Sequence, residues 1–350
     1  MRIPRWQAAP ADAVADAGII TPMDTLRVAV IGVGYLGRFH AQKYAALPGC
    51  RLVAVADARA DAGAVVAQEL GTRTVGDYRE LLGQVDAVSI VTPTAAHFEI
   101  ALAFLETGAH VLVEKPITET VAQAQQLVTA ARAAGRVLQV GHLERFNPAI
   151  IAAEPHLHAP RFIDCQRLAP FRERGTDVNV VLDLMIHDLD IVQSIVGSDI
   201  ESIDAIGTPV FSPEIDIANA RIRFANGCVA NATASRVSLK TERKLRVFQD
   251  DAYLSLDLQQ KILTVIRKQP AGAGAVAAAV GAAGAAGAAQ LPVSISEQSF
   301  EPGDALLREI EAFLASCRGE RPVAVSGEDG LRALRTAIAI TRAVHEGAPA

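Results

Sequence analysis

Short apolar runs alternate with helix-length segments through the first 146 residues. The runs at 26–31, 51–56, 85–91, 110–113 and 137–141 are rich in Val, Ile, Leu and Ala, as strands buried on both faces are. The intervening segments are long enough for helices. They lie at 37–47, from the strand at 51–56 to about residue 70, at 97–107 and at 121–134. This alternation predicts βαβ units and a doubly wound parallel sheet.

The pattern changes after Asn147-Pro148. A strand at 161–167 and a helix at 181–195 precede strand-like runs at 202–207, 217–224, 228–237, 244–248 and 252–257. Asn226-Gly227, between two of these runs, is a strong hairpin signal. Two more helices are predicted at 305–316 and 328–345. This half therefore predicts an α+β domain with a mainly antiparallel, open sheet.

These patterns predict an α/β protein in three parts. Residues 1–24 are expected to be a flexible N-terminal tail, residues 25–146 a Rossmann domain, and residues 147–350 an α+β domain for substrate binding and oligomerisation. The tract at 271–289 is almost entirely Ala and Gly and has little large apolar surface to bury. We expect it to be a flexible insertion between two strands.

Charge and cysteine content narrow the function. The net charge of −6, with 21% charged residues, gives no support to a protein that binds nucleic acid or an anionic membrane. The four cysteines lie far apart and form no CxxC pair, which favours reduced thiols over disulfides or a zinc site. No segment has the character of a membrane span or a signal peptide. We therefore expect a cytoplasmic protein.

A glycine loop, Gly32-Val33-Gly34-Tyr35-Leu36-Gly37, follows the first predicted strand and opens the first predicted helix. Gly32 allows a tight turn, Gly34 lets a pyrophosphate approach the backbone, and Gly37 lets the helix pack closely on the strand. The N–H groups at the helix N-terminus attract phosphate oxygens. We expect a dinucleotide here; the simpler alternative is a glycine-rich turn of an ordinary sheet protein.

Asp57 indicates which dinucleotide binds. It lies 20 positions after Gly37, at the end of the second predicted strand, where its carboxylate can accept hydrogen bonds from both ribose hydroxyls. The same charge would repel a 2′-phosphate, so the sequence favours NAD over NADP. Arg59 nearby keeps NADP open as the less favoured cofactor.

Two further motifs follow predicted strand ends, where ligands bind in such sheets. Thr92-Pro93 is expected to line the ribose and nicotinamide side of the cofactor. His97 either contacts the cofactor or is a polar residue at a helix start. In Glu114-Lys115-Pro116 the proline restricts the backbone of Lys115, and we expect Glu114 and Lys115 near the nicotinamide. The alternative for Lys115 is an ordinary surface lysine.

Asp183 and His187 lie four residues apart in a strongly apolar segment, so on a helix they share one face. A histidine with a carboxylate neighbour can act as a general base near neutral pH. A core histidine with satisfied hydrogen bonds is the alternative. A metal site that adds Asp188 and Asp190 is the least favoured interpretation, and we expect no metal.

Together, the glycine loop, Thr92-Pro93, Glu114-Lys115-Pro116 and the spacing from Asp183 to His187 resemble the glucose–fructose oxidoreductase/inositol dehydrogenase (Gfo/Idh/MocA) family from Leu26 onward. The resemblance implies an NAD-dependent oxidoreductase in which Lys115 and His187 act at the substrate carbinol and Asp183 assists. Either Lys115 or His187 can be the base. It also implies a homodimer or homotetramer formed through the open C-terminal sheet.

Three stretches, at 141–148, at 181–190, and at 216–221 together with 234–236, resemble a branch of this family. That branch oxidises the C3 hydroxyl of UDP-N-acetylglucosamine to a ketone, and the 3-keto product is later aminated for lipid A. A UDP-sugar pyrophosphate needs basic partners, although each candidate taken singly can be a solvated surface charge. The substrate-binding candidates are Arg145, Asn147, Arg172, Arg236 and Lys240.

Two other functions stay open on the sequence. One is a dehydrogenase of a free polyol or sugar such as an inositol, which would have less use for the arginines. The other is a non-catalytic regulator that binds a dinucleotide. The presence of both Lys115 and His187 argues against the regulator.

Overall fold

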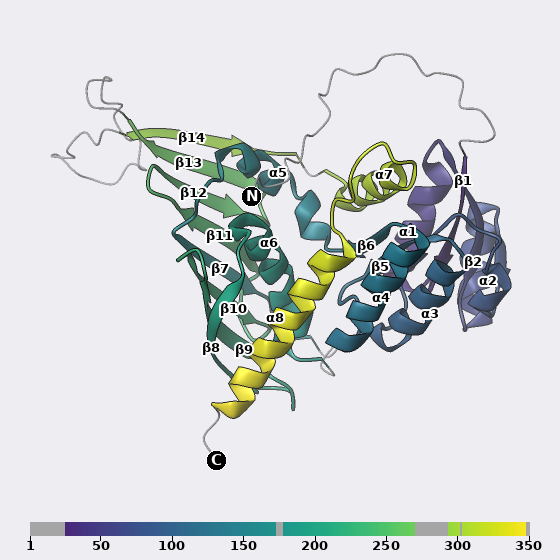
Figure 1. The fold of residues 1–350 in the computed structure, drawn as a ribbon, viewed down its shortest axis with the longest axis horizontal. Coiled ribbons are helices and arrows are strands. Elements are labelled where there is room, and N and C mark those ends of the chain that lie inside the picture. Colours follow the sequence, from purple (N-terminus) through teal and green to yellow (C-terminus); the bar gives the residue numbers. More distant parts are fainter. Residues whose placement is uncertain (1–24, 173–177, 270–292, 302, 348–350) are drawn as a thin grey trace. The chain divides into compact units, whose positions relative to one another are not determined.

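The computed structural model describes residues 25–172, 178–269, 293–301 and 303–347 (Figure 1). The predicted tail at 1–24 and the Ala/Gly tract at 271–289 lie outside the described residues. The chain forms two compact units. The first contains the chain up to Phe146 together with Asp304–Thr336, and the second contains Asn147–Gly303 and Ala337–Ala350.

A six-stranded parallel sheet, in the order β3-β2-β1-β4-β5-β6, forms the centre of the first unit. Helices α1 and α2 pack together, as do α3 and α4, so the sheet is wound on both faces (Figure 1). The strands are β1 (Leu26–Ile31), β2 (Cys50–Ala56), β3 (Arg73–Val75), β4 (Ala87–Ile90), β5 (His110–Glu114) and β6 (Leu138–Gly141). The helices are α1 (Tyr35–Ala46), α2 (Ala60–Leu70), α3 (Thr94–Glu106) and α4 (Val121–Ala134).

Local signals explain these elements. All four residues of β4 are buried, as the continuous apolar run predicts. A capping box between Thr120 and Gln123 begins α4, and Gly135, with φ of +62°, ends it in the left-handed conformation. Strand β3 was not predicted, because its three residues, Arg73–Val75, are too few to form a hydrophobic period.

The last helices did not follow the expected division of the chain. Helix α7 (Ala305–Cys317) and the start of α8 (Gly327–Glu346) belong to the first unit, although we expected everything from residue 147 onward in the second. Ile310, Phe313 and Leu314 of α7 join the core around Val28 and Tyr44. An amphipathic stripe shows that a helix buries one face, but not which core receives it.

The second unit is built on an eight-stranded sheet in the order β14-β13-β12-β11-β7-β10-β9-β8. All neighbouring strands are antiparallel except β7 and β10. Helices α5 (Pro148–Ala153) and α6 (Ile186–Val196) pack on one face (Figure 1). The strands are β7 (Phe162–Leu168), β8 (Ile200–Thr208), β9 (Ile217–Phe224), β10 (Val229–Ser235), β11 (Glu242–Phe248), β12 (Ala252–Asp257), β13 (Ile262–Lys268) and β14 (Val293–Ser299).

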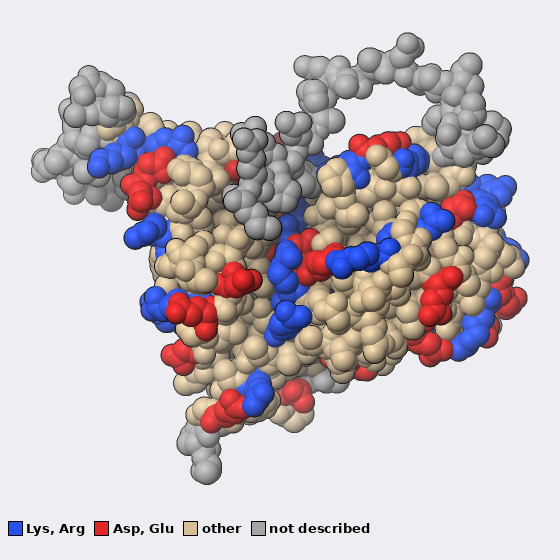
Figure 2. Space-filling model, in the orientation of Figure 1, with Lys and Arg blue, Asp and Glu red and all other residues tan. Residues whose placement is uncertain are grey.

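The predicted fold class, a parallel Rossmann sheet followed by a mainly antiparallel sheet, is confirmed. Strands β13 and β14 were not predicted. Strand β14 is mostly exposed and polar, so it carries little apolar signal. Among the described residues no helix is both long and apolar enough to cross a membrane. Acidic and basic side chains are interspersed on the face drawn in Figure 2.

Candidate active site

The glycine loop lies at the point where the strand order of the first sheet reverses. Strands β1 and β4 are neighbours, and Ile31 pairs with Ile90, so the segments after both strands leave the sheet side by side. A Cβ on Gly32, whose φ is +85°, would lie 2.7 Å from the Val91 carbonyl oxygen and 2.9 Å from the Thr92 methyl group. Only glycine fits this approach. In open α/β sheets this crevice is where nucleotides bind.

The N-terminus of α1 suits an anion. Gly34 is its N-cap, no side chain caps it, and its first turn contains no acidic residue. A Cβ on Gly34 would meet no atom within 4 Å, whereas one on Gly37 would collide with the Gly32 carbonyl. The backbone therefore combines tight packing at Gly37 with an open approach at Gly34. The residues present fit the pyrophosphate of a dinucleotide.

Asp57, which is predicted to bind the ribose hydroxyls, also accepts two backbone hydrogen bonds. Its Oδ2 accepts the N–H of Val33 at 2.9 Å, and its Oδ1 accepts the N–H of Arg59 at 2.9 Å. The carboxylate therefore ties the end of β2 to the glycine loop. Each oxygen keeps a second lone pair, so both remain able to accept a ribose hydroxyl.

Thr92 and Pro93 flank the loop from the neighbouring strand. The Oγ1 atom of Thr92 is buried and has no hydrogen-bond partner among the described residues. An unpaired buried hydroxyl costs free energy unless a ligand completes it. Pro93 is the N-cap of α3. The position of Thr92 beside Gly32 thus fits a polar contact with the cofactor.

His97 contacts the two segments that follow β4 and β5. It is buried, with Nε2 lying 2.9 Å from the Thr92 carbonyl oxygen and Nδ1 lying 3.0 Å from the Pro116 carbonyl oxygen. Burial lowers the pKa of His97. Both ring nitrogens face backbone carbonyls, so His97 lies between the Thr92 and Pro116 segments.

Lys115 stands at the carboxyl end of β5, directly after Glu114. Its N–H donates to the Oε2 atom of Glu114 at 3.3 Å, and its peptide bond to Pro116 is cis. The Glu114 side chain extends into the protein, where its Oε1 lies 3.2 Å from Nε2 of the buried His40. Lys115 is therefore partly buried, and it follows a carboxyl group whose two oxygens lie next to His40 and to the Lys115 N–H.

In the second unit, Asp183 and His187 occupy a helix with an irregular start. Residues Val181–Met185 form a π-helical turn, and α6 continues from Ile186. Asn179 stabilises this start, because its Oδ1 accepts the N–H groups of Val181 and Leu182 at 3.1 and 3.0 Å. Such turns are rare in proteins overall, and many of those that occur lie at functional sites. Sequence periodicity predicted the helix but not this wider turn.

A buried ion pair fixes the residue after His187. Arg167 of β7 donates to both carboxylate oxygens of Asp188, at 2.9 and 2.8 Å, and both side chains are almost fully buried. The bidentate geometry fixes the first turn of α6 against the sheet. This pair was not predicted, since nothing in the sequence links Asp188 to β7. Asp188 was considered only in the least favoured interpretation, a metal site.

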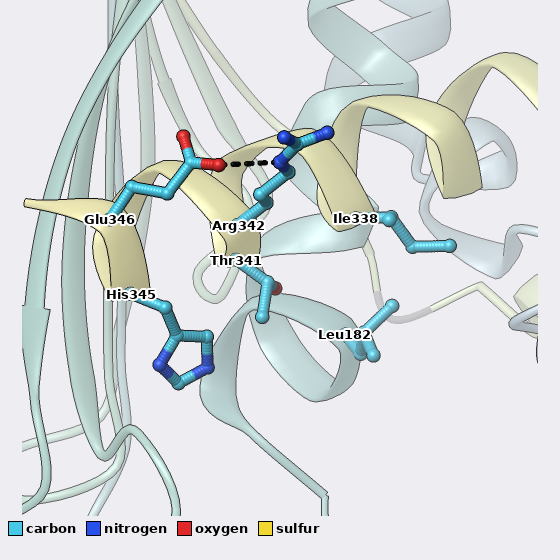
Figure 3. Close-up of a pocket in the computed structure, with 6 residues that line it drawn as sticks. All are labelled: Leu182, Ile338, Thr341, Arg342, His345 and Glu346. Atoms are coloured by element: carbon cyan, nitrogen blue, oxygen red, sulfur yellow. Dashed lines mark hydrogen bonds and ion pairs between the residues drawn. The ribbon is translucent and has the colours of Figure 1, made fainter.

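A cavity of about 430 Å³ lies elsewhere in the second unit, between the π-helical turn and the last turns of α8 (Figure 3). Arg342 donates to Glu346 at 2.6 Å on one side of it. Neither Asp183 nor His187 lines this cavity, so it is separate from the candidate catalytic residues. Its lining residues are Leu182, Ile338, Thr341, Arg342, His345 and Glu346.

Two of the predicted substrate-binding residues have internal partners. Arg236 is buried, and its Nε donates to Asp216 at 2.6 Å while its Nη1 donates to the Val178 carbonyl at 2.5 Å. Burial alone would raise the pKa of Asp216, but hydrogen bonds from the Ser212 backbone and from Arg236 lower it well below its usual range. Asn147 donates to the Leu258 carbonyl at 3.0 Å and caps α5. Both are placed to hold the fold.

The other three candidates are all basic, and two of them are exposed. Arg172 is exposed after β7, and Lys240 is exposed and pairs with Glu242. Arg145 is largely buried, with 18% of its side chain exposed, and lies 3.7 Å from Asp329. Strands β7 and β10 are parallel neighbours, with Leu168 beside Ser235. The loops that bear Arg172 and Lys240 therefore leave the same edge of the sheet.

These features define a nicotinamide-dependent oxidoreductase, and comparison with known families agrees. Residues 26–142 match the model of the Gfo/Idh/MocA oxidoreductase family with its NAD-binding Rossmann fold, and residues 171–350 match the C-terminal α/β domain of the same family. The chain belongs to this family, which confirms the resemblance.

Individual relatives refine the comparison. The chain is 40% identical to UDP-N-acetylglucosamine 3-dehydrogenase of Acidithiobacillus ferrooxidans, over 91% of this chain and 97% of that protein. A solved structure of that enzyme matches with a TM-score of 0.81 at 37% identity, over 92% of this chain and 98% of that chain. An NAD⁺-dependent scyllo-inositol 2-dehydrogenase of Bacillus subtilis is 31% identical over 61% of this chain and 68% of that protein.

Proposed function

We propose that this protein oxidises the C3 hydroxyl of UDP-N-acetylglucosamine to a ketone. The 40% identity to an enzyme of that name, over nearly the full length of both chains, carries the proposal. Lys115, Asp183 and His187, which the sequence analysis selected as catalytic, are all present in the matched regions. The product would be a 3-keto sugar nucleotide, and an amination reaction of the kind used for lipid A would consume it.

The proposed chemistry separates a hydride from a proton. When bound, NAD⁺ would supply the nicotinamide that accepts the hydride from C3. The hydroxyl proton goes to His187 or Lys115. The partner that is not the base stabilises the developing alkoxide by a hydrogen bond, and Asp183 orients the imidazole and stabilises its charged form.

For the cofactor we propose NAD rather than NADP. Asp57 supports this choice, because its carboxylate is fixed at the end of β2 by the N–H groups of Val33 and Arg59. A fixed negative charge at this position disfavours a 2′-phosphate. Arg59 exposes much of its side chain and would be the competing influence.

For the pyrophosphate of the substrate we propose Arg145, Arg172 and Lys240. Arg172 and Lys240 follow adjacent parallel strands, which supports a shared role at one sheet edge. Arg236 is assigned instead to the fold, because Asp216, Ser212 and the Val178 carbonyl take its donors.

The open face of the second sheet supports a further proposal, a homo-oligomer. Register places Phe162, Phe248, Tyr253, Ile266 and Ile295 in one row across five strands. The rings of Phe162 and Phe248 lie 5.6 Å apart, and those of Phe248 and Tyr253 lie 4.8 Å apart. A continuous row of partly exposed apolar side chains is typical of a protein interface. We propose that two copies of the chain pair through this row.

A panel assay tests the proposed activity. The protein is incubated with NAD⁺ or NADP⁺ and with UDP-N-acetylglucosamine, UDP-glucose or myo-inositol, and the reduced cofactor is read by absorbance. Because ketone formation can be uphill, a glutamate-dependent aminotransferase is added to remove the product. Turnover of UDP-N-acetylglucosamine is expected. Turnover of myo-inositol alone would favour the polyol dehydrogenase, and NAD binding without any turnover would favour the regulator.

A further inference from the structure

A buried group of three ionisable side chains in the first unit includes Glu114, the residue before Lys115. It consists of His40 from α1, Glu114 from the end of β5, and Glu309 from α7. One nitrogen or oxygen atom from each lies within 4.8 Å of the other two. His40 and Glu309 are fully buried, and both carboxyl oxygens of Glu309 have no hydrogen-bond partner among the described residues. Such groups are rare in folded proteins and need a physical explanation.

The Glu114 carboxyl group is confined on several sides. Its Oε1 lies 3.2 Å from Nε2 of His40, and its Oε2 accepts the N–H of Lys115 at 3.3 Å. Gly141 pairs with Glu114 across the sheet, and a Cβ there would lie 2.9 Å from the carboxyl carbon and from both oxygens. The carboxyl therefore occupies space that any other residue at 141 would fill.

Glu309 completes the group from a distant part of the chain. The Gln139 side chain donates to the Glu309 carbonyl at 3.2 Å, which fixes this turn of α7 beside β6. The ionisable groups that face Glu309 are Glu114, His40 and Tyr44. Burial, and then the charge of Glu114, raise the pKa of Glu309 well above its usual range. Two buried carboxylates would repel each other, and a neutral Glu309 avoids this repulsion.

We propose that His40, Gly141 and Glu309 confine the Glu114 carboxyl group to one position, and that Glu114 in turn positions Lys115 through the Lys115 N–H. His40, Glu114 and Glu309 are thus positioning residues for the catalytic lysine. The group also links α1, which carries the glycine loop, to the strand end that carries Lys115. This inference rests on the proposed role of Lys115 in hydride transfer.

The raised pKa of Glu309 makes the stability of the protein depend on pH. Above the ordinary carboxyl pKa, the folded chain keeps a proton that the unfolded chain has lost, so stability falls as pH rises. Glu309→Gln keeps the size and the neutral charge but cannot ionise. The variant should therefore match the wild type near pH 4 and be more stable than it at pH 8, as measured by urea unfolding. Equal stability differences at both pH values would overturn the neutral state of Glu309.

Gly141→Ala tests the positioning without adding any chemistry. The new methyl group must displace the Glu114 carboxyl, which is the flexible end of a side chain, so the fold should survive. Gly76→Ala is the matched control, because a Cβ there meets no atom within 4 Å. We expect kcat to fall about tenfold to 10²-fold in Gly141→Ala, because a small misplacement of a catalytic group slows the reaction strongly. The KM for NAD⁺ should change little. Full activity in Gly141→Ala would overturn the proposal.

Two further measurements keep this test independent of the substrate. The acylation rate of the Lys115 amine by a small active ester, followed by peptide mass spectrometry, should change in Gly141→Ala and in Glu309→Ala but stay at the wild-type value in Gly76→Ala and Glu309→Gln. Unchanged labelling in Gly141→Ala contradicts the positioning even if no UDP-sugar is turned over.

Metal analysis of the purified protein is the second measurement. A stoichiometric divalent metal that is lost in His40→Gln would make the group a metal site and overturn the proposal.

Discussion

His97 Nδ1 lies 3.0 Å from the carbonyl oxygen of Pro116, so one imidazole connects the ends of two strands. Its other nitrogen lies 2.9 Å from the Thr92 carbonyl. The two segments that it joins are those expected to line the cofactor and to carry Lys115. His97 therefore supports the candidate site from within the first unit.

Replacing His97 should destabilise the protein and slow the reaction. A neutral His97 donates its one N–H to the carbonyl of either Thr92 or Pro116. His97→Leu removes this hydrogen bond, and we expect a loss of about 1–3 kcal/mol in unfolding free energy. The kcat should fall as well, because the Thr92 and Pro116 segments lose their connection. Urea unfolding and steady-state kinetics measure the two effects. His158→Asn, at an exposed histidine that pairs with Asp251, is the control and should change neither.

Acid sensitivity should come partly from His110. Its Nδ1 accepts the N–H of Val137 at 2.9 Å, which requires an unprotonated nitrogen. Burial and the Arg136 charge lower the pKa of His110 to about 4. Between pH 6.5 and 4 the unfolded chain therefore binds more protons than the folded chain, and stability falls as pH decreases.

The variant His110→Gln removes this titration while keeping an acceptor. Proton uptake on unfolding near pH 5, obtained from urea midpoints across pH, should decrease by up to about one proton. Buried His97 also has a lowered pKa and remains in the variant, so some acid sensitivity persists. An unchanged pH slope would mean that His110 is already protonated in the folded protein.

Asp57 should set the cofactor preference. Asp57→Asn removes the charge and keeps one acceptor, so the glycine loop loses at most part of its support from Val33. We expect the ratio of kcat/KM for NAD⁺ to that for NADP⁺ to decrease by about tenfold or more, since a hydrogen bond to a charged group contributes about 1.5–3 kcal/mol. Asp61→Asn, at an exposed residue of α2, should leave the ratio unchanged. A constant ratio in Asp57→Asn would contradict the NAD assignment.

The row of apolar side chains on the second sheet predicts a defined oligomer. Phe248→Lys places a charge between Phe162 and Tyr253, and we expect the dissociation constant to rise about 30-fold or more, as for a central interface residue. Sedimentation velocity over a concentration series measures it. Leu239→Lys alters an apolar residue that is fully exposed outside the row. Equal effects of both substitutions would indicate that charge alone, rather than the row, governs association.

Local patterns predicted the parts of this protein that depend on neighbours in sequence. The glycine loop, Asp57, and the strand ends before Thr92 and Lys115 follow from periodicity and a short motif. Contacts between distant segments were not predictable in the same way. Arg236 was taken as a phosphate ligand because only the pairing of β9 with β10 brings Asp216 beside it.

The buried group of His40, Glu114 and Glu309 shows the same limit more clearly. His40 and Glu309 lie in helices near opposite ends of the chain, and each reads alone as one polar residue in an amphipathic helix. Helix α7 was predicted, but its return to the first unit was not. A single sequence gives no signal for which distant polar residues share a buried site.

The identity of the base can be decided with variants of Lys115 and His187. Loss of a general base should lower kcat by about 10²–10⁴-fold, so Lys115→Ala and His187→Ala are both expected to be strongly impaired. NADH binding, followed by fluorescence, should be retained in His187→Ala. Lys268→Ala, at an exposed lysine at the end of β13, is the control and should keep full activity.

Chemical rescue then separates the two roles. Added imidazole should restore part of the activity of His187→Ala if His187 accepts the hydroxyl proton, because a small base can occupy the space that the side chain leaves. If His187 is the base, added methylamine should restore part of the activity of Lys115→Ala. The acid limb of the pH–rate profile of that variant should not move, since it reports the ionisation of His187. Rescue of Lys115→Ala with a shift of the acid limb toward the pKa of the added amine would make Lys115 the base. Full activity of Lys115→Ala with no additive would contradict the proposed chemistry altogether.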